Sequence, residues 1–435
     1  MTEKYSSTSN SVFFSGDVLL QDDYWNSPPC SDTVTEFIRS KNLAITNLEA
    51  PVKTNFPIEK FGTNLSLTTT TIPTLDQLGF DAVSLSNNHI RDYGSDGVIE
   101  TTKECNKHGL KPFGVGTDSS DAISPLKYCI DGCSIAVFGL SEHRVSIATP
   151  DRSGAGWIYE AQIYDRIEAA SKEFDITIIV AHGGLEYIPI PPETWRSQLR
   201  SLAEVGADGI ISHHPHTPQG WEIYKETHIF YSLGNFMMYN SNRPSTQWSY
   251  GVNINLNESG ENTFSPVFFS VNDGEVDFMS DDEVATYESY LKQSSTIIAD
   301  EELYHGYWQE IAERLFYKSN YRYQYHDRLT EYGVGHLRSL LSNPVLEIER
   351  LTRGVTGTKA NREKALAILD QLQCPSHTDA MRTALEVEAG MLEDKRTREQ
   401  QRELDRLFEI SDGTQNETFV EKQLNRISTL LNRFR

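Results

Sequence analysis

Residues 175–216 read DITIIVAHGGLEYIPIPPETWRSQLRSLAEVGADGIISHHPH, and this stretch decides the fold class. Its two apolar runs, at 176–181 and 209–211, are too short for helices and rich in β-branched residues, so they predict buried strands. Residues 193–208 between them carry apolar side chains at helical spacing. A strand, a helix and a second strand in this order predict a βαβ unit and therefore a largely parallel sheet.

The same alternation extends outward over residues 11–278. Short apolar runs that end in polar residues recur there, and segments of helical character, such as SDTVTEFIRSK at 31–41, lie between several of them. After residue 250, YGVNINLN and FSPVFFSVNDGEVDF predict antiparallel strands joined by a turn. The fold class is therefore α/β. The other runs are SVFFSGDVLL, LAITNLEA, DAVSLSNNH, SIAVFGLSEH and HIFYSLGNF.

The character of the chain changes near residue 280, where strand signals become rare. We therefore expect an α/β domain over residues 1–285 and an all-α C-terminal module over residues 286–435. The second half of one long predicted helix is charged on all sides, which is typical of a solvated helix. Within the module, helices are predicted at 336–352, 361–372, 378–410 and 417–433.

The 435-residue chain carries a formal net charge of −23, and the charge is unevenly spread. Residues 1–300 account for −21 of it and residues 301–435 for −2. Such an acidic surface repels polyanions at long range, so we expect neither nucleic acid nor an anionic membrane as a partner. A small anionic substrate stays compatible when a metal ion holds it, because the charge of the ion dominates at short range.

The chain ends and the cysteines bear on the cellular compartment. The start, MTEKYSSTSN, lacks the basic and apolar regions of a secretory signal, and neither end carries a lipidation motif. No stretch reaches the roughly 20 apolar residues that a membrane helix needs. The five cysteines form no CxxC pair and no disulfide framework, which predicts free thiols. The sequence thus predicts a soluble cytoplasmic protein.

Five of the apolar runs end in residues that can bind a metal ion or take part in catalysis. Because ligands bind at the carboxyl ends of parallel strands, we expect these groups to converge on one edge of one sheet. Carboxylate, amide and imidazole groups together suit Mn²⁺, Fe²⁺ or Zn²⁺ better than Ca²⁺, which prefers oxygen ligands. The groups are Asp17, Asn47 with Glu49, Asn87 with Asn88 and His89, His182, and His213 with His214 and His216.

Each of these groups alone has an ordinary structural explanation. An Asp after a strand, such as Asp17, commonly caps a turn, and a lone His182 is more often a partly buried structural residue. The HHPH segment is more specific, because His214 and His216 project to the same side of an extended chain and the proline between them stiffens it. The joint pattern, in chain order, is what predicts a metal site.

In order and type, these motifs resemble those of the CapA family of bacterial capsule or poly-γ-glutamate synthesis proteins, which are relatives of calcineurin-like metallophosphoesterases. The similarity covers about residues 11–255, and the motifs are specific only as a set. The resemblance implies a four-layer α/β/β/α sandwich with a centre for one or two divalent metal ions at the strand ends. The motifs are GDVLL, NLEAPV, LSNNHIRDYGSDGV, AHGGLE, SHHPHTPQGWE and YSLGNF.

The resemblance also implies a role for each matching residue. Asn88 would be the metal-binding residue of an Asn-His motif, His89 the residue that assists the chemistry, and Asp92 its charge-stabilising partner. Glu49 would occupy the bridging position between metal ions. The other implied metal ligands are Asp17, His182, His214 and His216.

Two departures from the family pattern bear on the site. Asp17 is followed by Val18 and Leu19, so the Asp-x-His motif of ordinary metallophosphoesterases is absent and one metal position has fewer ligands. Gly183 follows His182 where many CapA-like proteins have Trp, which predicts a more open pocket.

Four further residues near the predicted strand ends are weaker candidates for contact with a substrate. Glu186 is either a carboxylate beside the site or a surface residue, and Asn235 either lies near the site or holds a turn. His143 and Arg144 either bind an anionic group or belong to a solvated loop. No role is assigned to the remaining histidines, of which His377 is one.

The residues and the resemblance together predict a metal-dependent hydrolase that acts on a phosphoester through a metal-bound hydroxide. A metal ion lowers the pKa of water toward neutrality, and His89, held by Asp92, would protonate the leaving oxygen. Two other functions stay open, hydrolysis of an amide and a non-catalytic assembly role in capsule or poly-γ-glutamate synthesis. The C-terminal module is predicted either to mediate self-association or to cover the active site.

Overall fold

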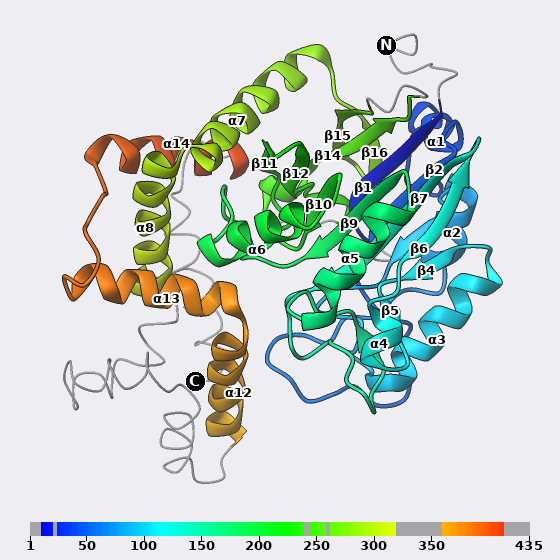
Figure 1. The fold of residues 1–435 in the computed structure, drawn as a ribbon, viewed down its shortest axis with the longest axis horizontal. Helices are drawn as coiled ribbons and strands as arrows, with labels where there is room; N and C mark the ends of the chain where they lie inside the picture. The colour runs from blue at the N-terminus through cyan, green and yellow to red at the C-terminus, as the bar shows by residue number, and fades with distance from the viewer. Residues whose placement is uncertain (1–9, 21–23, 239–242, 258–261, 319–358, 413–435) are drawn as a thin grey trace.

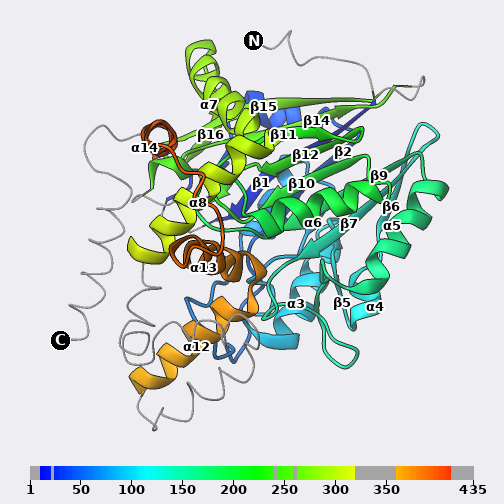
Figure 2. The same cartoon turned by 60° about the vertical axis from the view of Figure 1, so that its left-hand side comes forward.

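Two β-sheets packed face to face form the centre of the molecule, which we describe from a computed structural model (Figure 1). Helices cover the outer face of each sheet, and further helices lie at one side (Figure 2). The predicted four-layer α/β/β/α sandwich followed by a helical region is therefore confirmed. The helices predicted at 336–352 and 417–433 lie outside the described residues. The structure describes residues 10–20, 24–238, 243–257, 262–318 and 359–412.

The first sheet has eight strands, seven of them in the order β16-β15-β14-β1-β2-β3-β4, with β13 paired to β1. β1 runs parallel to β2 and β13 and antiparallel to β14. The antiparallel strands predicted after residue 250 are confirmed as β14 to β16. The bounds are β1 Ser11–Leu19, β2 Leu43–Leu48, β3 Ala82–Ser84, β4 Lys111–Phe113, β13 Asn235–Met238, β14 Trp248–Asn255, β15 Thr263–Asn272 and β16 Glu275–Phe278.

The second sheet has six strands in the order β11-β12-β10-β9-β7-β6. Its centre is the predicted βαβ unit, in which β9 and β10 are parallel and joined through α6. A short ladder of β5 (Val115–Gly116) and β8 (Gly154–Ala155) stands apart. The bounds are β6 Leu126–Ile130, β7 Cys133–Ser141, β9 Ile176–His182, β10 Gly209–His213, β11 Gln219–Tyr224 and β12 Thr227–Ser232.

The outer helices bury one apolar face each. α1 (Asp32–Arg39), α2 (Thr71–Leu78) and α3 (Gly94–Lys107) share a hydrophobic cluster with the outer face of the first sheet. α5 (Ala161–Glu173) and α6 (Glu193–Glu204) pack on the second sheet, and α4 is a single turn at Ser119–Ala122. Ser31 caps the first helix, because its Oγ accepts a hydrogen bond of 3.3 Å from the Val34 amide.

The C-terminal helices are packed onto the sandwich. Tyr304 and Trp308 of α8 belong to the same hydrophobic cluster as the second sheet, and α7 lies along β11. Because α7 spans the predicted boundary at residue 285, the division into two domains there stays a prediction. The bounds are α7 Asp281–Ala299, α8 Glu301–Lys318, α12 Lys359–Gln373, α13 Pro375–Glu388 and α14 Arg398–Asp412, and a 3-10 turn lies at Pro244–Thr246.

The single helix predicted at 378–410 is wrong, because residues 389–397 separate α13 from α14. Gly390 has a φ of 65°, which ends α13. The backbone that follows is held by α8 instead of by its own helix: Gln309 Nε2 donates to the Glu393 carbonyl over 2.9 Å, and Gln309 Oε1 accepts from the Lys395 amide over 2.8 Å. A tertiary contact thus replaces the helix that the local sequence favours.

The register of neighbouring strands places their polar ends side by side. Asp17 is paired with Asn47 of β2 and with Asn235 of β13. His182 is paired with His213 in the second sheet. The predicted groups therefore come from two sheets, and the expectation of one edge of one sheet is wrong. Each sheet has a core of parallel strands with antiparallel strands beside it, and the polar carboxyl ends of the two parallel cores meet.

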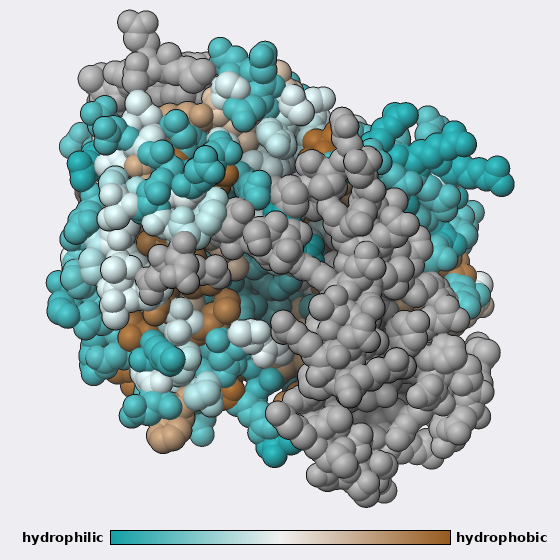
Figure 3. All heavy atoms as spheres, turned by 180° about the vertical axis from the view of Figure 1, so that it is seen from behind, coloured by the Kyte–Doolittle hydropathy of each residue, from teal (hydrophilic) through white to brown (hydrophobic). Residues whose placement is uncertain are grey.

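The exterior agrees with the composition. Figure 3 shows hydrophilic side chains over most of the described surface on the side opposite to that of Figure 1. Among the described helices, none is long and apolar enough to cross a membrane. All five cysteines are free, as predicted.

Candidate metal centre

Asp17 lies at the centre of the strand-end cluster and is fully buried. Its Oδ1 accepts a hydrogen bond of 2.7 Å from Asn47 Nδ2 and lies 3.0 Å from His213 Nδ1, while its Oδ2 lies 3.1 Å from His216 Nδ1. Burial raises the pKa of Asp17, but contact with the two imidazoles outweighs burial and holds the pKa well below its ordinary value. Asp17 is therefore a carboxylate that links the two sheets.

Glu49 follows β2 and is also fully buried. Its Oε2 accepts a hydrogen bond of 2.6 Å from Asn47, and its Oε1 lies 3.6 Å from His182 Nε2. Burial and then the charge of Asp17 raise the pKa of Glu49 well above its ordinary value. Two carboxylates so close together are costly without a positive charge between them.

His182, at the end of β9, joins Glu49 to the residues that follow β3 and β10. Its Nε2 lies 3.1 Å from Asn88 Oδ1, and its ring centre lies 5.0 Å from that of His214. One ligand atom each from Glu49, His182 and His214 lie within 4.8 Å of one another, and Glu186, His214 and His216 form a second such group. The structure thus brings together every predicted metal ligand.

These residues fit a divalent metal ion. Glu49 Oε1 and His214 Nδ1 are buried and have no hydrogen-bond partner among the described residues. An unsatisfied buried polar atom costs about 1–3 kcal/mol, which a bound cation would remove. Burial lowers the pKa values of His182 and His214 well below the ordinary value, so both imidazoles are neutral, as metal binding requires. Oxygen and nitrogen donors together suit Mn²⁺, Fe²⁺ or Zn²⁺.

The HHPH segment holds its two predicted ligands in an uncommon backbone conformation. His214 has a φ of 98° and His216 a φ of 56°, so the chain is not extended there, and the predicted reason for their shared direction is wrong. Their ring centres are nevertheless 5.9 Å apart, and the Pro215 carbonyl between them accepts a hydrogen bond of 2.8 Å from the Tyr187 amide. Strained backbone of this kind concentrates at functional sites.

His89 and Asp92 form the predicted pair. His89 Nδ1 lies 2.8 Å from Asp92 Oδ2, which also accepts a hydrogen bond of 2.7 Å from the Leu65 amide. The Lys60 ammonium group, which is almost buried, contacts Asp92 Oδ1 and lies 3.1 Å from His89 Nδ1. Burial lowers the pKa of His89, and the hydrogen bond to Asp92 partly opposes this.

The four weaker candidates separate in space. Asn235 Oδ1 lies 2.9 Å from His216 Nδ1, and the ring centre of His143 lies 4.4 Å from that of His214, so both border the cluster. Glu186 is exposed and belongs to the second group of possible ligands. Arg144 is also exposed, and its guanidinium group lies 4.7 Å from the ring centre of Trp157, outside the cluster.

The expectation of a more open pocket beside Gly183 is wrong. A Cβ atom at this position would lie 2.6 Å from Cη2 of Trp195 and 2.7 Å from Cβ of Glu142. These two side chains fill the space, and glycine is the residue that leaves room for them.

Sequence reasoning left several residues of the site without a role. Asn47 and His213 stand beside predicted ligands, so their positions at strand ends were a usable signal. Glu142 carries the same signal, because it directly follows β7 in the run SIAVFGLSEH, but its role depends on distant partners. Lys60 carries no such signal, because it comes from a loop without a motif.

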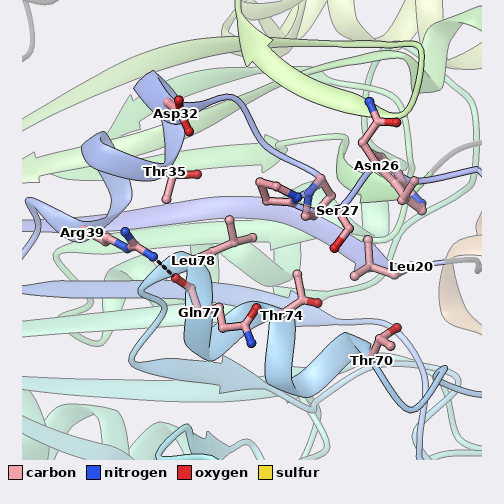
Figure 4. A pocket seen from close by; sticks show the side chains of 13 residues that line it. Leu20, Asn26, Ser27, Asp32, Thr35, Arg39, Thr70, Thr74, Gln77 and Leu78 are labelled. Carbon is pink, nitrogen blue, oxygen red and sulfur yellow. Dashed lines mark hydrogen bonds between the residues drawn. The ribbon is translucent and has the colours of Figure 1, made fainter.

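A separate pocket of about 460 Å³ lies between α1, α2 and the loop that follows β1 (Figure 4). Arg39 at its edge donates a hydrogen bond to the Gln77 carbonyl. None of the predicted site residues lines this pocket, so it is distinct from the strand-end cluster.

A two-sheet sandwich with buried carboxylate, amide and imidazole groups at its strand ends defines an α/β protein whose strand-end cluster is compatible with a divalent metal ion. Residues 11–240 match the family described as bacterial capsule synthesis protein PGA_cap, and the chain belongs to this family.

The similar proteins include two that are named for biosynthesis. The chain is 27% identical over 251 residues to capsule biosynthesis protein CapA of Bacillus anthracis, with 55% of this chain and 61% of that protein covered. It is 28% identical over 271 residues to PGA biosynthesis protein CapA of Bacillus subtilis (strain 168), covering 60% and 71%. An uncharacterized protein y4sH of Sinorhizobium fredii is 22% identical, covering 87% of this chain and 91% of its own length.

Proposed function

We propose that this protein is a metal-dependent hydrolase that cleaves a phosphoester, as calcineurin-like metallophosphoesterases do. The observation that supports the proposal is the buried, unpartnered Glu49 Oε1, which lies 3.6 Å from His182 Nε2 and belongs to a carboxylate next to Asp17. A bound cation would compensate the charge of a carboxylate in this position. Without a cation, the buried carboxylate destabilises the fold.

The donor set divides into two overlapping groups. Glu49, Asn88, His182 and His214 would hold one ion, and Asp17, Glu49 and His216 would hold a second, more weakly bound one. A divalent cation acidifies water and stabilises the negative charge that develops on a phosphoryl group. Asn47 and Asn235 orient the carboxylate and imidazole ligands through the hydrogen bonds described above.

His89 is proposed to move the proton. Because its Nδ1 is held by Asp92 Oδ2, its Nε2 is the atom left to exchange a proton with the leaving oxygen. Lys60 contacts Asp92 and adds positive charge beside the imidazole. His143 and Glu186, which border the cluster, are the proposed contacts to the rest of the substrate, and a contact from Arg144 stays a prediction.

The substrate is proposed to be small and anionic. The strongly acidic first 300 residues would repel a polyanion, whereas a small anion is held by the local charge of the metal ions. A cytoplasmic location and self-association through the helical region stay predictions.

The test combines metal analysis with a panel of phosphomonoesters and phosphodiesters. We expect purified protein to contain Mn, Fe or Zn and to turn over at least one member of the panel, with loss of turnover in EDTA. His89→Ala should lose about 100-fold or more in kcat while the metal content stays unchanged. Turnover that survives in a double variant, His214→Ala with His216→Ala, would contradict the proposal.

A role in capsule or poly-γ-glutamate synthesis is a second proposal, and the family description and the names of the two Bacillus relatives favour it. It is compatible either with hydrolysis of an amide in such a polymer or with an assembly role without catalysis. Release of glutamate from γ-glutamyl peptides by the purified protein would support the amide reaction. Metal-containing protein that turns over neither class of substrate would favour assembly.

A further inference from the structure

The junction of α12 and α13 is anchored to the strand-end cluster by one buried carboxylate. Glu142 directly follows β7, is fully buried, and lies in the chain beside His143. Ser376, near the start of α13, donates from its hydroxyl group, which lies 2.9 and 2.8 Å from the two carboxylate oxygens of Glu142, and from its amide over 3.2 Å. An anchor of this kind is specific, because both partners are buried and charge-assisted hydrogen bonds are strong.

The same carboxylate is also bound to the sandwich. Glu142 Oε2 accepts a hydrogen bond of 2.9 Å from the Gly184 amide, in the loop that follows His182, and Oε1 accepts one of 3.2 Å from the Tyr159 hydroxyl group. Glu142 therefore joins the loop that follows the predicted metal ligand His182 to a helix more than 200 residues away in the chain.

Two further contacts hold α12 and α13 across this side of the site. Asp379, buried in α13, accepts a hydrogen bond of 3.0 Å from the amide of Thr194, in the first turn of α6. Arg362 of α12 forms an ion pair with Glu59, the neighbour of Lys60. Figure 2 shows α12 and α13 meeting at an angle, with α13 between α8 and the sandwich. The two helices thus contact three separate segments around the strand ends, which are the end of β7, the first turn of α6 and the loop of Glu59.

This arrangement places side chains of the C-terminal region beside the cluster. Cys374 Sγ lies 4.0 Å from His143 Nε2, whose ring in turn contacts His214. His377 lies in the first turn of α13, directly after Ser376, which is bound to Glu142. It is close enough to His143, His214 and Glu186 for their charges to influence one another. These contacts bring a helix beyond the matched family region into the same space as the predicted ligands.

We propose that the α12–α13 junction is a wall of the active site, in which Glu142 is a positioning residue and His377 contacts the substrate on the side of His143 and Glu186. The substrate contact of His377 rests on the proposed function, whereas the anchoring of the α12–α13 junction by Glu142 does not. A wall on this side of the site favours a compact substrate or a chain end.

The first test follows the wall without using activity. Cys374 is buried at the junction, so its rate of alkylation by iodoacetamide, measured by peptide mass spectrometry on the full chain, reports opening of the wall. We expect Glu142→Ala to raise this rate by about tenfold or more, and Ser376→Ala, which removes only the hydroxyl group, by a smaller factor. Cys30 and Cys105, buried in the other core, serve as internal controls and should not change.

The pattern of alkylation rates decides the positioning role of Glu142. An unchanged Cys374 rate in both variants means that Glu142 does not hold the wall. Equal increases at Cys374, Cys30 and Cys105 mean general unfolding, and the result for Ser376→Ala then decides. A selective increase at Cys374 supports the proposal whether or not the protein hydrolyses any phosphoester.

The second test concerns His377. With Mn²⁺ present, inorganic phosphate should slow alkylation of Cys374 in the wild-type protein, and His377→Ala should weaken this protection. In turnover of the best phosphoester, His377→Ala should raise KM by about tenfold, as expected for loss of one buried hydrogen bond, while kcat changes less than about threefold and metal content is unchanged.

The matched control is His305→Ala, because His305 is an exposed histidine on α8, another C-terminal helix. It should leave both phosphate protection and KM unchanged. Wild-type values of both quantities in His377→Ala would overturn the substrate contact. Phosphate protection that depends on His377 in a protein without turnover would support the wall and refute the hydrolase.

Discussion

The two sheets contribute opposite chemistry to the same site. The first sheet supplies the carboxylates, Asp17 and Glu49, together with amides, while the second supplies imidazoles that include His182 and His214. The part of the site that comes from the first sheet is therefore rich in negative charge, and the part that comes from the second sheet is rich in neutral bases. Neither sheet alone provides the complete site. The buried polar residues of the cluster compensate one another where the two sheets meet.

The pKa shifts describe the same difference. Burial and Asp17 raise the pKa of Glu49, whereas burial lowers the pKa values of His182 and His214. His216 differs from the other imidazoles: burial lowers its pKa, but the hydrogen bond and charge of Asp17 outweigh burial and raise it to about 9. In the absence of metal, the contact between Asp17 and His216 therefore joins the two halves, and the predictions below test this contact and its surroundings.

The largest effect is expected from removing the charge that joins the sheets. Asp17→Asn leaves His213 and His216 without their buried partner, and the loss of one member of a buried ion pair costs about 3–5 kcal/mol. We expect a fall of this size in the free energy of unfolding by urea in EDTA. Glu288→Gln, in an exposed ion pair on α7, is the control and should change it by less than about 0.5 kcal/mol. Equal effects of the two substitutions would show that the sheets do not depend on Asp17.

The next effect concerns pH in the metal-free protein. Because the folded-state pKa of His216 lies above the ordinary value of 6.5, its contribution to stability is complete below pH 6.5 and is lost as the pH rises toward 9. The expected loss is on the order of 3 kcal/mol. Urea unfolding in EDTA at several pH values measures it, and the difference from His216→Gln isolates it from Glu49, whose raised pKa acts in the same direction.

A bound divalent ion should remove this dependence, because a metal ligand has already lost its proton. In Mn²⁺, we therefore expect the stability between pH 6.5 and 9 to vary much less than in EDTA. A wild-type profile in EDTA that is flat over this range would contradict a protonated His216.

The smallest effect is expected at Lys60, beside the pair of His89 and Asp92. Lys60→Met removes the ammonium group that contacts Asp92 and lies beside His89, and should lower kcat for a phosphoester by about tenfold. Lys53→Met, in the same loop but exposed, is the matched control and should leave kcat unchanged within about twofold. If both variants keep the wild-type kcat, Lys60 has only a structural role.

The residues of the strand-end cluster were predictable from the sequence because each carries a local signal. An apolar run that ends in Asp17, Glu49 or His182 identifies a strand end, and strand ends of parallel sheets converge. The division into two sheets was not visible locally, since β1 and β9 have equally apolar sequences. Register and packing between distant segments decide it.

The parts that sequence reasoning missed depend on tertiary contacts. Lys60 lies in a loop without a motif, and His377 follows a helix start that gives no sign of the cluster beside it. The break between α13 and α14 depends on Gln309 of another helix. These features depend on which surfaces pack together in the folded protein. The local sequence around each residue does not contain that information.

The separation of Glu142 and Ser376 in the sequence affects the order in which parts of the site are synthesised. The two residues are 234 positions apart, so at about 5–20 residues per second a ribosome needs on the order of tens of seconds to add the second after the first. All the predicted metal ligands precede residue 217 and are made within that interval or before it. During synthesis the cluster therefore has a period without its wall, when an ion can enter from the side that the finished protein closes.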